Sequence, residues 1–149
     1  MHIPVISPLL KLLTALINSI SSRAIRRAEA CRDFRSVFHE ELEGLYPMPS
    51  NWPKGTGIEP RLRAVFPTLQ AAVATFRPFV LEKERARFDD AWLNYHTSTK
   101  REIDEDYTHY MNFTATTGNT FGGETVISAD GKAQFQRNVD RLLAFARDV

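Results

Sequence analysis

The sequence has very little cysteine: Cys31 is the only one among 149 residues. A disulfide within one chain is therefore excluded, which favours a reducing compartment and predicts a cytoplasmic protein. Cys31 lies at helical spacing from Phe34 and Phe38, so we expect it to be a small buried apolar residue. The net charge is only +1 at pH 7, so the whole chain carries no charge excess that would attract a polyelectrolyte partner.

The sequence also lacks the motifs of enzymes, nucleotide-binding proteins and metal sites. His39-Glu40 begins like the zincin H-E-x-x-H, but position 43 is glutamate, so the motif fails. The glycines at 118–123 match neither the phosphate-loop nor the dinucleotide-binding pattern. No nucleophile, base and orienting residue stand at a recognised spacing. We therefore predict no catalytic residue, no cofactor and no metal site, and the interpretation leans towards a protein that is not an enzyme.

A long, uniformly apolar run is missing as well, but the N-terminal part is amphipathic. Ser7-Pro8 is a good helix start, with serine as the N-cap and proline in the first turn. The helix that follows is shorter than the ~30 Å hydrocarbon core of a bilayer, and no basic segment or cleavage site of a signal peptide accompanies it. Its apolar side carries Leu9, Leu12, Leu13, Leu16, Ile17 and Ile20. We expect residues 1–22 to be an amphipathic helix and residues 23–149 a single helical domain.

Charge is distributed unevenly along the chain. Residues 1–35 hold six basic and two acidic side chains, a net charge of +4, which leaves −3 for the remainder. Arg23, Arg26 and Arg27 directly follow the apolar stripe. The N-terminal helix is therefore expected either to pack on the domain or on a second copy of it, or to lie in a membrane surface with these arginines near anionic head groups.

Apolar residues at helical spacing predict the remaining helices. One helix contains Cys31, Phe34, Phe38 and Leu42 and ends near Gly44, and nothing between Pro8 and Gly44 compels a break. Residues 46–58 are rich in proline and glycine and predict a loop, which Trp52 is expected to pin to the core. The final helix carries Phe135, Val139, Leu142, Leu143 and Ala146.

The stretch 69–95 is predicted to form the centre of the core. Glu59-Pro60 should start a short helix, and Phe66-Pro67 should mark a bend. The next helix should end near Arg77, because Pro78 cannot donate a backbone hydrogen bond and should instead begin another helix. So short a connection predicts antiparallel neighbours, between which four aromatic side chains should meet: Phe76, Phe79, Phe88 and Trp92. Arg77 and Arg85 are expected to have structural roles.

Residues 96–127 are polar and rich in threonine. Residues 107–115 and 124–127 are candidates for extended pieces that could form a short hairpin. The sequence as a whole thus predicts a mainly α fold, a small bundle of about four to five helices with a long irregular loop before the last one.

Several short motifs resemble a group of uncharacterised bacterial proteins. They are F-R-x-x-F-x-x-E-L at 34–42, A-A-V-x-x-F-R-P-F at 71–79, F-D-x-A-W-x-x-Y at 88–95 and a terminal L-L-x-x-A at 142–146. Members of that group often begin with a hydrophobic segment. The resemblance implies a bacterial helical domain and no activity, since the shared positions are mostly those of core residues.

Three functional hypotheses remain open at this level. The leading one is a non-enzymatic helical interaction module that self-associates or attaches to a membrane surface through its N-terminal helix. The second is a metal-binding protein or enzyme that uses the acidic loop around His96 and His109, with Glu102, Asp104, Glu105 and Asp106. The third is a nucleic-acid binder through the basic stretch 23–35, against which stands the lack of any accompanying nucleic-acid-binding signature.

Overall fold

The computed structural model describes residues 8–99, 105–111, 114–118, 124–128 and 131–147. Within them lie four α-helices: α1 (Pro8–Glu41), α2 (Ile58–Phe76), α3 (Arg85–His96) and α4 (Gly131–Leu143). Two strands, β1 (Thr114–Gly118) and β2 (Glu124–Ser128), pair antiparallel before α4, with Thr116 opposite Val126. The fold is mainly helical, as the sequence predicts.

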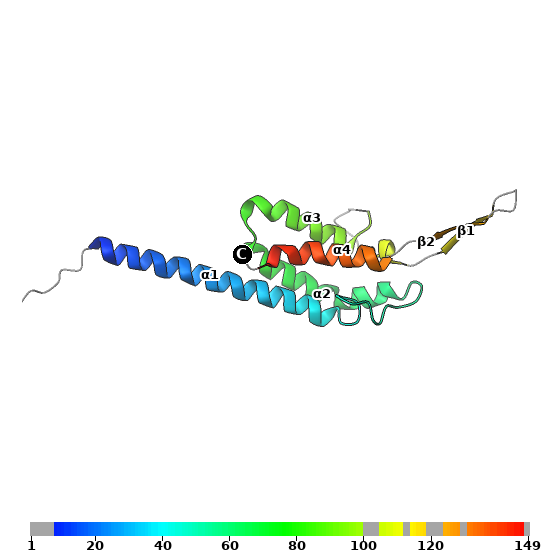
Figure 1. The fold of residues 1–149 in the computed structure, drawn as a ribbon, viewed down its shortest axis with the longest axis horizontal. Helices are drawn as coiled ribbons and strands as arrows, with labels where there is room; N and C mark the ends of the chain where they lie inside the picture. Colours follow the sequence, from blue (N-terminus) through cyan, green and yellow to red (C-terminus); the bar gives the residue numbers. More distant parts are fainter. Residues whose placement is uncertain (1–7, 100–104, 112–113, 119–123, 129–130, 148–149) are drawn as a thin grey trace, which may run out of the picture.

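The four helices alternate in direction along the bundle (Figure 1). The main backbone contacts of α2 are with α1, and those of α3 are with α4. The helices α2 and α3 are antiparallel, as predicted, and meet at Phe76 and Phe88, but neither is the other's main neighbour. The reason is the ring of Phe34 from α1, whose centroid lies 4.4 Å from that of Phe76 on α2 and 6.0 Å from that of Phe88 on α3.

The connection from α2 to α3 also differs from the prediction. Pro78 lies in a single 3-10 turn (Arg77–Phe79), the chain is extended at Val80, and α3 begins only at Arg85 after a second 3-10 turn (Glu82–Glu84). The Arg85 guanidinium donates to the carbonyls of Val80 and Pro78 at 3.2 and 3.3 Å, which stabilises the turn. Arg77 forms a bidentate pair with Asp89, both contacts at 2.8 Å. The structural roles expected for the two arginines are confirmed.

Proline does not divide α2. Pro60 lies in its first turn and Pro67 lies inside it, yet the helix runs unbroken from Ile58 to Phe76. The prediction of a separate short first helix is thus wrong, because α2 continues through Phe66-Pro67. Buried apolar residues continue on both sides of Pro67, among them Leu62, Val65 and Leu69, so packing against α1 outweighs the lost backbone hydrogen bond.

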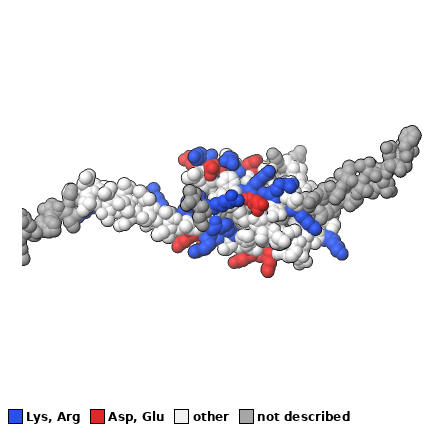
Figure 2. All heavy atoms as spheres, viewed as in Figure 1, with Lys and Arg blue, Asp and Glu red and all other residues white. Residues whose placement is uncertain are grey.

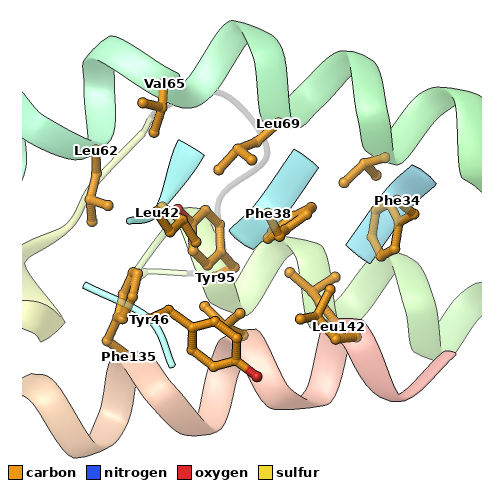
Figure 3. Packing of buried hydrophobic residues seen from close by; sticks show 14 of the residues in the cluster. Phe34, Phe38, Leu42, Tyr46, Leu62, Val65, Leu69, Tyr95, Phe135 and Leu142 are labelled. Atoms are coloured by element: carbon orange, nitrogen blue, oxygen red, sulfur yellow. The ribbon is translucent and has the colours of Figure 1, made fainter. Parts of the chain in front are cut away.

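The core lies where the inner half of α1 enters the bundle. Figure 3 shows Phe34, Phe38 and Leu42 of α1 pointing between α2 on one side and α3 and α4 on the other. Phe76 and Phe88 are buried and in contact, as predicted, and the buried Phe34 of α1 packs against both. The other two predicted members differ.

Trp92 and Phe79 are only partly buried. Trp92 stacks on Phe66 and Tyr95 at centroid distances of 5.6 and 5.3 Å instead of joining the phenylalanine cluster. The phase of the helix explains this: α3 turns positions 88, 91 and 95 into the core, and Trp92 lies one residue after Ala91, at the edge of the buried side. The phase predicted for α3 is therefore right for Phe88 and wrong for Trp92.

The loops are fastened to this core by aromatic side chains. Trp52 packs against Phe135 at a centroid distance of 5.4 Å, so the predicted anchoring of the loop 46–58 is confirmed. The extended piece predicted from Tyr107 begins later, because residues 108–110 form a 3-10 turn. That turn is held by the buried Tyr110, whose hydroxyl donates to the Tyr95 carbonyl at 2.8 Å.

Candidate interaction surface

The N-terminal half of α1 extends beyond the other helices (Figure 1). Every residue from Pro8 to Arg26 is exposed, and the first buried residue of the helix is Cys31. We call residues 8–25 the arm. The helix passes residues 22 and 23 without a break, so the arm is a direct continuation of the segment that forms the core.

The arm presents large apolar side chains to solvent. Their exposed fractions range from 53% for Leu13 to 77% for Leu9. All six apolar residues predicted for the contact surface belong to this set, which is Leu9, Leu10, Leu12, Leu13, Leu16, Ile17, Ile20 and Ile25. Folded proteins seldom expose so many large apolar side chains next to one another.

Apart from Lys11, the charged side chains of this part of α1 lie at the base of the arm. Lys11 is the only charged residue within 8–22, and Figure 2 shows the arm mostly white, with blue and red side chains over the bundle. Of the three predicted arginines, Arg23 and Arg26 are exposed. Arg27 is partly buried and turns into a groove beside α3 and α4, together with Arg87, Arg141 and Arg147. The structure thus brings the six apolar residues together on the arm but separates Arg27 from the other two arginines.

A groove of about 510 Å³ lies between α1 and α2, next to the base of the arm. Its apolar lining comes from Ala30, Phe34 and Val37 of α1, and from Ala71, Ala72, Phe76 and Phe79 of α2 and the turn after it. Three charged side chains of α1 also line it: Arg26, Glu29 and Asp33. Sequence reasoning missed this groove, because it exists only once α2 lies beside α1. The only feature of the sequence that could have indicated the groove is the pair of small residues Ala71-Ala72, which stands among larger apolar residues of α2.

The histidines of the acidic loop do not converge on a common point. His96 Nδ1 lies 2.6 Å from the Trp92 carbonyl oxygen, and His109 Nε2 lies 3.1 Å from that of Asn94. Burial lowers the pKa of both imidazoles, more than their hydrogen bonds raise it. Their neutral forms are therefore favoured in the folded protein.

The acidic residues near these histidines have other partners. Glu105 bonds to Arg63 and Tyr107, while Asp106 bonds to Ser98 and Thr108. Glu102 and Asp104 lie outside the described residues. Over the part of the chain that the structure describes, no three or more His, Cys, Asp or Glu side chains are grouped so as to hold a metal ion.

The basic stretch 23–35 does not form one surface. Because successive helical residues are about 100° apart, its five arginines are spread around α1. Arg35 donates to the carbonyl of Ala146 and so joins α1 to the end of the chain. Arg32 lies 3.8 Å from its neighbour Asp33. These five side chains therefore do not form a continuous basic face that could bind a nucleic acid.

Comparison with protein-family models, curated proteins and solved structures gave no match. The resemblance to short bacterial proteins accordingly stays a prediction. Among the helices of the described residues, none combines the length and apolar character needed to cross a membrane. What the fold and the surface define is a class of protein, a four-helix bundle whose first helix projects from it and exposes an apolar stripe.

Proposed function

We propose that this protein is a non-enzymatic helical interaction module and that the arm is its contact surface. The observation that carries the proposal is the exposure of large aliphatic side chains along the arm, each more than half accessible to water. Burial of apolar surface is favourable by about 25 cal/mol per Å². Binding of the arm to a surface that covers these side chains is therefore favourable.

The connection of the arm to the core suits such a role. The same helix continues into the bundle, where Cys31, Phe34 and Phe38 are buried. A helix that is held at one end by tertiary packing keeps its helical form at the other end more readily than an isolated peptide. The arm is thus preorganised, and its partner gains a fixed orientation relative to the bundle.

A second candidate is peripheral attachment of the arm to an anionic membrane surface on the cytoplasmic side. The exposed Arg23 and Arg26 beside the apolar stripe favour it. Each basic residue close to an anionic bilayer contributes about 1 kcal/mol, and salt weakens that attraction.

The test is a triple variant of the full chain, Leu12→Gln, Leu16→Gln and Ile20→Gln. Glutamine is a good helix former, so the change removes apolar surface and keeps the helix. The matched control places glutamine at Thr14, Asn18 and Ser21 on the polar side. We expect the parent and control to self-associate in light scattering or to co-sediment with vesicles that contain phosphatidylglycerol, and the triple variant to do neither. A parent chain that is monomeric and indifferent to vesicles would refute the proposal.

A further inference from the structure

We infer that the partner of the arm is a second copy of this chain, and that the two arms lie antiparallel across one another's α1–α2 grooves. This inference rests on the proposed function and names the occupant of the surface. The apolar side chains of the arm are not covered by the described part of the chain, and the apolar groove of the bundle is open. Exchange of arms between two copies satisfies both.

The arm and the groove lie on one side of the same helix. Leu12 and Leu16 precede Ala30 and Phe34 by 18 residues each, which is about five turns at 3.6 residues per turn. Ala30 and Phe34 line the groove. The apolar side of the arm therefore runs directly into the wall of the groove. A second α1 placed antiparallel on this side meets apolar surface along the arm and beside the bundle.

Charge favours the same arrangement. Lys11 is the sole charge within 8–22, and the groove lining carries the exposed carboxylates of Glu29 and Asp33 against one basic residue, Arg26, which leaves it net acidic. In a two-fold contact, residue i of one copy meets residue j of the other, and j meets i. Pairing Lys11 with Glu29 and Asp33 places the symmetry axis near residues 20–22, so the inner parts of the two arms face each other and the tip of each arm reaches the partner's groove.

The arm and the groove together offer about as many residues as a stable dimer interface uses. A standard interface uses about 20–30 residues and about 800 Å² on each partner. The arm of 8–25 and the twelve residues that line the groove together provide a surface of this order on each copy. The interface repeats its contacts about the two-fold axis, so it closes as a dimer and leaves no free arm to extend an assembly.

The decisive test alters the groove and leaves the arm intact. Ala71 is exposed on α2 and lines the groove, whereas Ala74 is exposed on α2 outside it. For the full chain we expect a mass in light scattering of twice 17.0 kDa, retained by the control Ala74→Arg. Ala71→Arg should weaken dimerisation at least about tenfold, since it places a charge in the apolar groove. A dimer unaffected by Ala71→Arg would overturn the inference.

The register is tested by exchanging charges. Lys11→Glu alone and the pair Glu29→Lys with Asp33→Lys should each weaken the dimer, and the three changes together should restore it. If the combined variant dimerises no more tightly than the partial variants, the antiparallel pairing is overturned. A parent that is monomeric in solution but binds anionic vesicles through the arm would overturn the second copy as partner, while the proposed function would stand. A monomer that binds neither would refute both.

Discussion

The ring of Phe34 on α1 stacks on that of Phe76 on α2, with centroids 4.4 Å apart and ring planes inclined by only 14°. Phe34 also packs against Phe88 of α3, with the rings tilted by 57° and their centroids 6.0 Å apart. One side chain thus joins three helices at the point where the arm leaves the bundle. It also forms part of the groove wall, so the core and the proposed contact surface meet at this residue.

Replacement of Phe34 by alanine should destabilise the fold by about 3–5 kcal/mol, because a nearly fully buried ring leaves a cavity among three helices. Urea denaturation followed by circular dichroism measures the loss. Phe79→Ala is the matched control, since Phe79 is only partly buried, and it should cost clearly less. Equal losses for the two variants would contradict the central position assigned to Phe34.

Gly131→Ala should also destabilise the protein, for a different reason. A Cβ atom at position 131 would lie 2.1 Å from the backbone carbonyl oxygen of Tyr110, which is far inside contact distance. The start of α4 must then move away from the 108–110 turn, at a cost of about 1–3 kcal/mol, as for other overpacked sites. Thermal unfolding measures the shift. An unchanged melting temperature would show that α4 and this turn are not in contact.

The stability of the fold should fall as the pH is lowered from 7 to 5. Burial lowers the pKa of His96 and His109 below the ordinary value of 6.5, so the unfolded chain takes up protons before the folded one does. The contribution of the two neutral imidazoles to the free energy of unfolding is complete above pH 6.5. It is lost as the pH falls towards and through their folded-state pKa values. Urea midpoints measured across this range should show the loss.

The double variant His96→Gln, His109→Gln should flatten this pH dependence. His39→Gln is the control, because His39 is exposed on α1, and it should leave the slope as in the parent. A slope that persists in the double variant would assign the pH dependence to other groups.

Removal of residues 1–22 should leave the bundle folded. The arm side chains are exposed, and the buried stripe of α1 starts only at Cys31. At low protein concentration, where no partner is bound, the urea midpoint of residues 23–149 should equal that of the full chain. Unfolding of the shortened chain would mean that the arm is part of the bundle and not a separate contact surface.

Local patterns in the sequence were enough to place much of the helical content. The 3- and 4-residue spacing of Cys31, Phe34, Phe38 and Leu42 identified the buried side of α1, and that spacing depends only on the pitch of the helix. The same reasoning identified the arm and its apolar residues, because Leu9 to Ile20 follow the same period. Proline was a less reliable guide: Pro67 lies within α2 and Pro78 precedes α3 by a full turn and more.

The sequence by itself therefore determined that the protein is mainly helical, the apolar side of α1 and of α4, and that no recognised catalytic motif accompanies them. Only the tertiary structure decided that α1 packs on α2 and α3 on α4, that the apolar side of the arm stays uncovered, and that a groove opens beside it. Helical period is a property of neighbouring residues in the chain. The choice of partner depends on contacts between distant segments, such as Phe34 with Phe76, and on where along α1 the shorter helices end.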